Sequence, residues 1–353
     1  MPQDQDKQDI RKLTVEELKA FFTAQGDKAF RAKQVYEWLW QKSATGFSEM
    51  TNLSKTTREM LEAHFVINNA IIEDEQKSND RTIKSSLQLF DKNMVEGVLI
   101  PTKKRMTACI SSQVGCSLSC TFCATGKLDR KRNLDASEIY DQVVLIKNQA
   151  EKEYEQPLTN IVYMGMGEPL LNYANVLKSV EHITSPEGLA MSPRRITIST
   201  AGIAKMIRKL GDDEVKFNLA LSLHAANDIK RNEIMPINET NSLIELRDAL
   251  KYYFSKTKNQ VTYEYILFYN FNDSLEDAEE LYQFTKHIPC MVNIIEYNPV
   301  ADTPFAKAEE KSLDKFVAYL DKRGVTVKVR RSRGKDIDAA CGQLAGKKLD
   351  KRH

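Results

Sequence analysis

The sequence contains no run of 18 consecutive apolar residues, the length at which a segment becomes a candidate for a membrane-spanning helix. It also lacks the basic stretch and apolar run of an export signal, because MPQDQDKQDIRKL is polar and includes several acids. Cysteine is scarce: the six cysteines gather around one motif and do not form a disulfide framework. We therefore expect a protein of the cytoplasm, a reducing compartment, with no membrane partner and with cysteines used for chemistry.

A large excess of charge of either sign is also missing, since the formal net charge is only +2, but the charge is unevenly distributed. Between Lys322 and Arg352, eleven Lys or Arg residues stand against three Asp residues, a local charge of +8 that leaves −6 for the rest. Further basic clusters occur at 103–105, 127–132 and 194–195. Any one cluster could simply face water, but several clusters around one candidate site favour a phosphate-bearing substrate.

Residues 12–66 have the pattern of a small helical domain. Thr14 and Glu17 form a capping box, Gly26 is placed to end the first helix, and FRAKQVYEWLWQK carries apolar residues at helical spacing. The polar stretch 73–82 is expected to be a turn or linker, followed by strand-like runs. The expected domains are a helical accessory domain at 1–72, a β-type linker or extension at 73–106, a core at 107–330 and a basic tail at 331–353.

From residue 107 onward, strand-like runs alternate with helix-like runs, which is typical of βα units around a parallel sheet. The runs are 107–111, 160–164, 195–199, 216–222, 262–268 and 292–297, and 326–330 is a candidate edge strand. Six units are too few for a closed eight-stranded barrel. The expected fold class is therefore α/β, an open partial (βα)6 barrel with a small helical N-terminal accessory domain.

Three cysteines, Cys116, Cys120 and Cys123, lie within eight residues in QVGCSLSCTFCATG. Separations of three and two residues let one tight loop hold a 4Fe-4S cluster with three thiolates, which leaves one iron open. An open iron can bind a small molecule directly, and the associated reaction is the reductive cleavage of S-adenosylmethionine. The alternatives are a structural zinc site, which needs four ligands, and cysteines buried by chance.

Other unusual residues follow the ends of the predicted strands, where ligands gather in parallel βα folds. In GMGEP, Gly167 lets the backbone approach a ligand and Glu168 offers an acceptor for an ammonium group. Ser199, Ser222 and Asn298 suit ribose hydroxyls or a carboxylate, or they cap helices. His224 is a candidate base or metal ligand, although packing or an adenine contact is favoured. These strand ends predict one composite pocket.

Three further residues are candidates for the chemistry. Cys341 lies in DIDAACGQLAGKK, a Gly-flanked segment directly beyond the basic run KVRRSRGK, where positive charge favours a reactive thiolate. Cys109 lies inside the first strand and is equally well a core residue, whereas Cys290 is expected to be structural. Glu96 is an acid within an apolar strand, so it is either paired structurally or held for proton transfer.

Five segments together resemble the RlmN-type radical S-adenosylmethionine methyltransferases, which act on adenine C2 in RNA. They are CISSQVGCSLSCTFCATG, VYMGMGEPLLN, ALSLHA, IIEYNPV and DIDAACGQLAG, and the resemblance covers essentially the whole chain. A related branch, which methylates adenine C8 and confers antibiotic resistance, shares the cluster and both reactive cysteines. MGMGEPLLN and CGQLAG look more like the C2 branch, so C8 methylation is the second expectation.

The resemblance implies a role for each candidate. The cluster ligands would be Cys116, Cys120 and Cys123, and S-adenosylmethionine would be bound by Gly167, Glu168, Ser199, Ser222, Leu223, His224 and Asn298. Two molecules of S-adenosylmethionine would be used per turnover, one to methylate Cys341 and one to form the radical that activates this methyl group. Cys109 would form a disulfide with Cys341 as the RNA is released, and either Glu96 or Cys109 would remove the C2 proton.

The resemblance also implies the partners. The substrates would be an adenosine in the peptidyl-transferase centre of 23S ribosomal RNA and one next to the anticodon of transfer RNA, gripped by the helical domain and the basic tail. A flavodoxin or ferredoxin-type donor would supply electrons to a monomeric enzyme. A reading from another class is a non-catalytic RNA-binding protein whose cysteine loop is a structural metal site.

Overall fold

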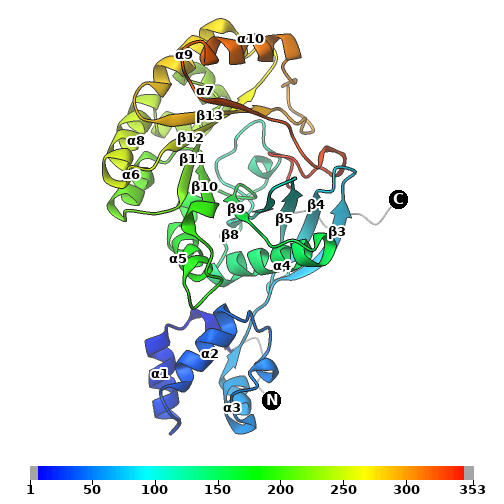
Figure 1. Cartoon of the computed structure of the whole chain (residues 1–353), viewed down its shortest axis with the longest axis vertical. Helices are drawn as coiled ribbons and strands as arrows, with labels where there is room; N and C mark the ends of the chain where they lie inside the picture. The colour runs from blue at the N-terminus through cyan, green and yellow to red at the C-terminus, as the bar shows by residue number, and fades with distance from the viewer. Residues whose placement is uncertain (1–6, 346–353) are drawn as a thin grey trace.

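A ten-stranded sheet organises the structure, a computed structural model that describes residues 7–345 (Figure 1). From one edge to the other, the strands are β14 (Val327–Arg330), β13 (Cys290–Glu296), β12 (Val261–Leu267), β11 (Asn218–Ser222), β10 (Ile196–Thr200), β9 (Asn160–Tyr163), β6 (Met106–Cys109), β5 (Met94–Pro101), β4 (Ile83–Gln88) and β3 (Ile71–Lys77). Two short pairs lie outside it: β1 (Gln8–Asp9) with β2 (Phe65–Val66), and β7 (Gln113–Val114) with β8 (Arg132–Asn133).

Helices connect and cover these strands. The α-helices are α1 (Val15–Ala24), α2 (Arg31–Trp40), α3 (Lys55–His64), α4 (Ala136–Tyr154), α5 (Tyr173–Thr184), α6 (Ala204–Asp212), α7 (Asp228–Ile234), α8 (Leu243–Thr257), α9 (Leu275–Thr285) and α10 (Glu310–Asp321). The 3-10 helices are η2 (Ile10–Lys12), η3 (Phe47–Glu49), η4 (Thr125–Lys127), η5 (Pro169–Asn172), η6 (Pro193–Arg195), η7 (Pro236–Thr240) and η8 (Lys335–Ile337). Within residues 7–345, none of them combines the length and apolarity needed to cross a bilayer.

All neighbouring strands from β6 to β14 are parallel, so the predicted βα units are confirmed, including the edge strand β14. The inner strands are almost continuously buried because helices cover one face and the cysteine loop lies on the other (Figure 1). The sheet ends at β14 and β3 without closing, which confirms an open partial barrel. Its carboxyl-terminal strand ends therefore open on one side.

The expectation of a turn or linker over residues 73–82 is wrong for residues 73–77. These residues belong to β3, which pairs antiparallel with β4, and β4 and β5 extend the parallel sheet in the same manner. Side chains of β3 alternate between exposed and half-buried, as expected for an edge strand with one face in water. Its acids hid the strand pattern because they occupy exposed as well as half-buried positions. The predicted turn is present at residues 78–82, where the Ser78 amide donates to the Thr82 carbonyl oxygen.

The first three helices form the small helical unit that the sequence predicted. The Thr14–Glu17 capping box begins α1, and Gly26 has a positive φ of 71° just after its end. Helix α2 packs on the main sheet's helices, because the Trp40 ring stacks on the His182 ring of α5 with centroids 3.5 Å apart. Burial lowers the pKa of His182 to about 3, so this stacked imidazole is neutral.

A buried ion pair fixes the helical unit to the core. Arg11 donates to Asp141 on α4 at 2.7 Å, to Asp9, and to the carbonyl oxygen of Asn68 at 2.6 Å. The second oxygen of Asp141 accepts the Ala70 amide at 3.0 Å. Burial raises the pKa of Asp141, and Arg11 acts in the opposite direction by stabilising the carboxylate. Arg11 therefore connects η2, the segment before β3, and α4.

Replacing Arg11 with Ala should destabilise the protein by roughly 3–5 kcal/mol, because it leaves the Asp141 charge buried without its partner. Arg31→Ala is the control: it breaks a more exposed pair with Asp27 and should cost about 1 kcal/mol or less. Urea unfolding followed by the fluorescence of Trp38 and Trp40, both on α2, measures the difference. Equal losses in the free energy of unfolding would show that the buried ion pair contributes no more stability than the exposed one.

Candidate active site

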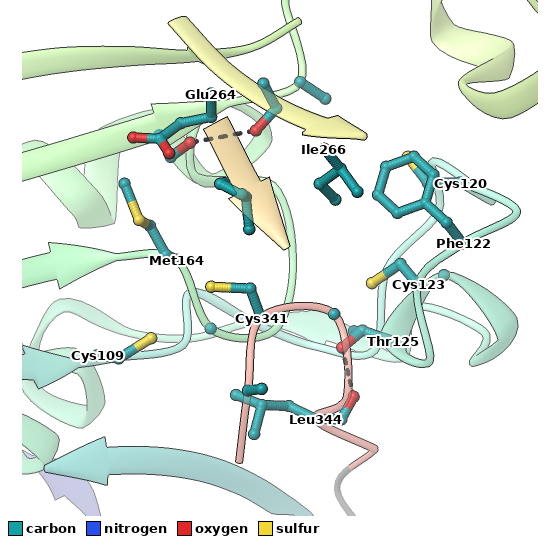
Figure 2. A pocket seen from close by; sticks show the side chains of 18 of the residues that line it. Cys109, Cys120, Phe122, Cys123, Thr125, Met164, Glu264, Ile266, Cys341 and Leu344 are labelled. Carbon is teal, nitrogen blue, oxygen red and sulfur yellow. Dashed lines mark hydrogen bonds between the residues drawn. The ribbon is translucent and has the colours of Figure 1, made fainter. Parts of the chain in front are cut away.

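The carboxyl-terminal strand ends enclose one pocket that contains five of the six cysteines (Figure 2). These are Cys109, Cys116, Cys120, Cys123 and Cys341. Five other residues predicted for the site also line it: Gly167, Glu168, Ser199, Ser222 and His224. The remaining three, Glu96, Leu223 and Asn298, are buried beside the pocket and do not line it. Cys290, predicted to be structural, lies at the start of β13 and is also absent from the lining.

The loop from Cys116 to Cys123 is folded tightly on itself. The Cys123 amide donates to the Cys120 carbonyl oxygen at 3.2 Å, and a side chain at Gly126 would place its Cβ 2.7 Å from that same oxygen. Glycine is therefore required at position 126 for the loop to close. Burial raises the pKa of all three thiols, that of Cys116 to about 11.

The donor set of this loop fits a cluster. Within residues 7–345, no three His, Cys, Asp or Glu side chains converge closely enough to hold a single metal ion. A 4Fe-4S cluster makes a different demand, because each of its thiolates binds a different iron and so need not converge on one point. Three free thiols on one loop, all facing one pocket, meet that demand.

The C-terminal loop brings Cys341 to the cysteine loop. The Gly342 carbonyl oxygen accepts from the Ala124 amide at 2.7 Å, and the Leu344 carbonyl oxygen accepts from the Thr125 hydroxyl at 2.6 Å (Figure 2). The Ala345 amide donates to the Glu96 carboxylate at 2.7 Å. Glu96 also lies 3.8 Å from Lys84. Glu96, which the sequence predicted as an acid within an apolar strand, thus holds the C-terminal loop in place.

The expectation that the basic segment makes Cys341 a thiolate is wrong for the structure. The thiol is open to the pocket but surrounded by protein, and this desolvation raises its pKa, while Arg330 acts in the opposite direction. Burial also raises the pKa of Cys109, to about 12. Cys341 interacts electrostatically with both Cys109 and Cys123, and it lies between them (Figure 2). The rest of the predicted basic tail, residues 346–353, lies outside the described residues.

Gly167 and Glu168 occupy the turn after β9. Gly167 has φ of 91°, and an added Cβ would lie 2.4 Å from the Cβ of Gln113. The Glu168 carboxylate accepts from the Leu170 amide at 2.9 Å and from the Ala201 amide at 2.7 Å, which fixes it at the pocket wall. Burial raises its pKa, with these amides acting the other way. A carboxylate that keeps free lone pairs can still accept a hydrogen bond from an ammonium group.

The next strand ends supply neutral polar groups. The hydroxyls of Ser199 and Ser222 lie 3.3 Å apart on β10 and β11. His224 accepts the Ile266 amide through Nδ1 at 3.1 Å, and burial lowers its pKa to about 3, so it is a neutral ring packed edge-on to Phe122. The Asn298 side-chain oxygen is buried and has no hydrogen-bond partner within residues 7–345, as expected beside a polar ligand.

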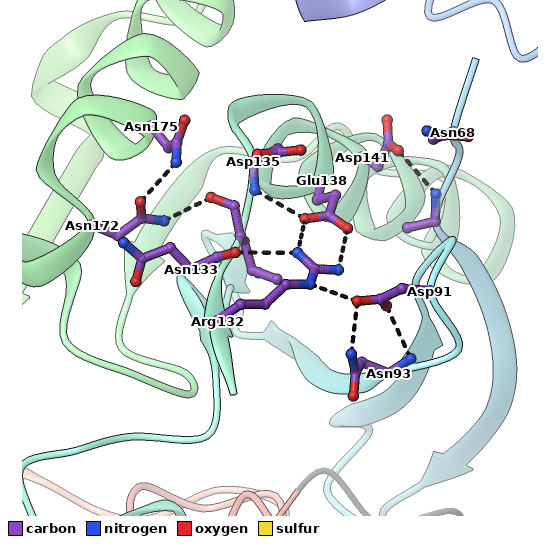
Figure 3. Close-up of polar contacts among 12 residues, drawn as sticks. Asn68, Asp91, Asn93, Arg132, Asn133, Asp135, Glu138, Asp141, Asn172 and Asn175 are labelled. Atoms are coloured by element: carbon purple, nitrogen blue, oxygen red, sulfur yellow. Dashed lines mark hydrogen bonds and ion pairs between the residues drawn. The ribbon is translucent and has the colours of Figure 1, made fainter. Parts of the chain in front are cut away.

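Two of the basic residues after the cysteine loop, Lys127 and Arg132, make structural contacts within the protein. Arg132 donates to both oxygens of Glu138, at 2.7 and 2.8 Å, and to Asp91 at 2.6 Å (Figure 3). Lys127 donates to the carbonyl oxygens of Ala301 and Asp302. Arg132 thus secures the segment after the cysteine loop to α4 and to the turn before β5, and Lys127 secures it to the segment after β13. Arg130 and Lys131 are exposed.

Sequence reasoning missed three charged residues of the site. Glu264 and Arg330 line the pocket, and the Glu264 carboxylate accepts from Asn293 at 2.8 Å and lies 3.5 Å from Arg330. Glu264 carries the same signal as Glu96, an acid within an apolar strand, and could have been found by it. The third, Arg231, lies fully buried behind the pocket wall, and no local pattern marks it.

Comparisons with known proteins agree with this geometry. Residues 8–67 match the ribosomal RNA large subunit methyltransferase N-terminal domain, and residues 110–285 match the radical SAM superfamily. A probable dual-specificity RNA methyltransferase RlmN of Cytophaga hutchinsonii is 62% identical over 97% of this chain and 94% of that protein. The dual-specificity RNA methyltransferase RlmN of Geotalea uraniireducens is 44% identical over 98% of both. A crystal structure of a radical SAM methyltransferase from Sphaerobacter thermophilus superposes with a TM-score of 0.90, at 38% identity over 96% of this chain and 100% of that one.

The open βα barrel and its cysteine loop define a radical SAM enzyme, a class that holds a 4Fe-4S cluster and binds S-adenosylmethionine. The match of the N-terminal domain, and the alignment of relatives over nearly their whole length, identify one family within this class. The chain belongs to the RlmN family of RNA methyltransferases.

Replacing Gly167 with Ala should weaken binding of S-adenosylmethionine roughly 100-fold, because the new Cβ displaces the Glu168 turn by about 1 Å. Gln113 cannot yield easily, since it bonds to both Asn133 and the Glu168 amide. Gly26→Ala is the matched control, with φ of 71° but open space around the added atom. Calorimetric titration of the cluster-loaded protein gives the affinities. Wild-type affinity in Gly167→Ala would contradict the assignment of this turn to the cofactor.

Proposed function

We propose that the protein methylates C2 of adenosine in the peptidyl-transferase centre of 23S ribosomal RNA, and of adenosine next to the anticodon in transfer RNA. The observation that carries this proposal is the position of Cys341, which faces the pocket between the cysteine loop and Cys109. Relatives that align over the full chain are named dual-specificity RNA methyltransferases, which supports two classes of RNA as substrates.

The cofactors would be held by residues on the pocket wall. Cys116, Cys120 and Cys123 would hold the 4Fe-4S cluster, and the bound cluster and S-adenosylmethionine together supply radical chemistry. Gly167 and Glu168 would receive the amino group of S-adenosylmethionine. The other polar contacts would come from Ser199, Ser222, the Leu223 backbone, His224 and Asn298. The neutral His224 offers no charge, so its part is to shape and orient the site.

Cys341 would carry the methyl group to the RNA. Its thiol must lose a proton to accept a methyl group, and Arg330 is the described cation that favours the thiolate. Radical addition suits adenine C2, which is electron-poor and reacts badly as a nucleophile. Cys109 faces the same pocket and would form a disulfide with the Cys341 sulfur as the bond from that sulfur to the transferred carbon breaks; that carbon then takes up a proton and leaves as the methyl group of the RNA. Position favours Cys109 over Glu96 as the group that takes the C2 proton, because Glu96 is bonded to Ala345 behind the lining.

RNA would be gripped by positive surface around the pocket. Arg331 and Arg333 line its mouth and are partly exposed, and the exposed residues 103–105 add a basic turn. Phosphate contacts of this kind supply most of the affinity for nucleic acid. The helical residues 1–72 and the tail 331–353 would extend the grip. We further propose that the protein works as a monomer and takes electrons from a flavodoxin or ferredoxin-type donor.

Two alternatives give different products. An adenine-C8 methyltransferase would yield 8-methyladenosine, and a non-catalytic RNA-binding protein with a structural metal would yield no modified base. Mass spectrometry of RNA nucleosides, after anaerobic incubation with reconstituted protein, S-adenosylmethionine and a reductant, should detect 2-methyladenosine. Metal analysis adds a second test: about four iron and four sulfide per chain support the enzyme, whereas one zinc supports the binding protein.

Cys341→Ala should form neither methylated RNA nor a protein–RNA adduct, because it removes the sulfur that carries the methyl group. Cys109→Ala should instead accumulate the adduct, since the thiol that resolves it is missing. The adduct is measured as an RNase-sensitive slow band on a reducing denaturing gel. Cys290→Ala is the control, because that thiol donates to the Thr285 carbonyl oxygen away from the pocket lining, and it should methylate RNA normally. Normal turnover without a band in soluble, cluster-loaded Cys109→Ala would refute the assignment.

A further inference from the structure

Arg231 on α7 is a fully buried cation surrounded by neutral acceptors. Its guanidinium donates to the carbonyl oxygens of Leu223, Ala201 and Ser222 at 3.0, 2.5 and 3.2 Å, and to the Asn238 side-chain oxygen at 2.6 Å. Among the described residues, no carboxylate lies within ion-pair distance of it. Arg11, the other deeply buried arginine described above, pairs directly with Asp9 and Asp141.

An unpaired buried charge is costly, so its retention needs an explanation. Proteins bury charges beside an opposite charge or a metal, and breaking such a pair costs several kcal/mol. Burial lowers the pKa of Arg231 to about 10, which still leaves it charged at neutral pH. The fold therefore maintains a positive charge here without supplying a carboxylate in contact with it.

The cysteine loop lies next to this charge. Thr121, which follows Cys120, donates its amide to the carbonyl oxygen of Ile234 at the end of α7, at 3.1 Å. Arg231 lies three residues before Ile234 on the same helix, about one turn away from this hydrogen bond. One helix thus connects the buried cation to the loop assigned to the cluster.

We propose that Arg231 is a buried counter-charge for the cluster held by Cys116, Cys120 and Cys123, and that it raises the reduction potential of this cluster. The proposal rests on the proposed function, since it requires a cluster at this loop. A 4Fe-4S cluster with three thiolates is anionic, and reduction by one electron makes it more so. A nearby fixed cation therefore stabilises the reduced form more than the oxidised form.

The charge of Arg231 acts on the one-electron reduction of the cluster, a step in which no covalent bond forms or breaks. One electron comes from a low-potential one-electron donor, and the guanidinium keeps its protons and its hydrogen bonds. Arg231 is a positioning residue, because its bonds to Ala201, Ser222 and Leu223 also hold the ends of two strands of the pocket. The test must therefore separate its charge from its hydrogen bonds.

Two variants make this separation in the full-length, cluster-loaded protein. Arg231→Gln removes the charge, whereas Arg231→Lys keeps the charge but loses the forked geometry. Midpoint potentials are measured by anaerobic titration with titanium(III) citrate, followed by the electron spin resonance of the reduced cluster. In Arg231→Gln the equilibrium constant for reduction should fall at least tenfold, about 59 mV for a one-electron couple. Arg231→Lys should stay near the wild-type potential.

Two further variants complete the experiment: one that should leave the potential unchanged and one that should raise it. Arg247→Gln removes a partly exposed arginine from the neighbouring helix α8 and should leave the potential unchanged, because water and salt screen it. Asp228 carries the opposite charge to Arg231 but does not contact it directly. The two are linked by Asn238, whose side-chain amide donates to Asp228 at 2.8 Å. Asp228→Asn should therefore raise the potential, and it provides the test if Arg231→Gln does not load its cluster.

The outcomes are distinguishable. A lowered potential in Arg231→Gln, with Arg231→Lys near wild type, supports the counter-charge. Equal shifts in both variants, an unchanged potential in Arg231→Gln, or a lowered potential in Asp228→Asn would overturn it. Wild-type protein that binds no iron would instead refute the proposed function, whatever the behaviour of these variants.

Discussion

Hydrogen bonds from Ala124 to Gly342 and from Thr125 to Leu344 join two segments more than 200 positions apart. They matter because Cys341 has no regular secondary structure of its own to place it; it lies just beyond η8. The Cys341 segment is hydrogen-bonded to the cysteine loop and, through Ala345 and Glu96, to β5. Cys341 therefore lines the same pocket as Cys116, Cys120 and Cys123. If Cys341 carries the methyl group as proposed, these hydrogen bonds keep that group in the same pocket as the cysteine loop.

The sheet supplies the surface on which these loops meet. Because β6 and β9 to β13 are parallel, all their carboxyl ends open on one side, and the residues that follow them converge. Leu223 shows how this works for a residue outside the pocket lining. Its side chain is core, yet its backbone is held by Arg231 and Glu264, so that Ser222 and His224 on either side face the pocket.

Much of this arrangement could be predicted from the sequence because it is encoded locally. The βα alternation gives the strands, and the spacing of Cys116, Cys120 and Cys123 gives the loop, each within a short window. What sequence reasoning missed depends on contacts between distant segments. Arg231 can be recognised as a buried cation of the site only from its contacts with the ends of two strands, which are distant in sequence. The structural role of Arg132 likewise appears only from its bonds to Asp91 and Glu138. Strand β3 was missed because an edge strand tolerates acids that would exclude it from an inner position.

The electrostatics of Cys341 shows why neighbours in sequence are a poor guide to reactivity. Its basic neighbours do not surround the thiol: Arg331 pairs with Glu310, and Lys335 pairs with Glu296. Arg330 acts on the Cys341 thiol but is shared with Glu264, so burial is the larger effect and raises the pKa of Cys341. Burial has the same effect on the three cysteines of the loop, and metal binding must displace their protons. Burial therefore raises the pKa of the thiols that line this pocket, although the Cys341 side chain itself stays exposed.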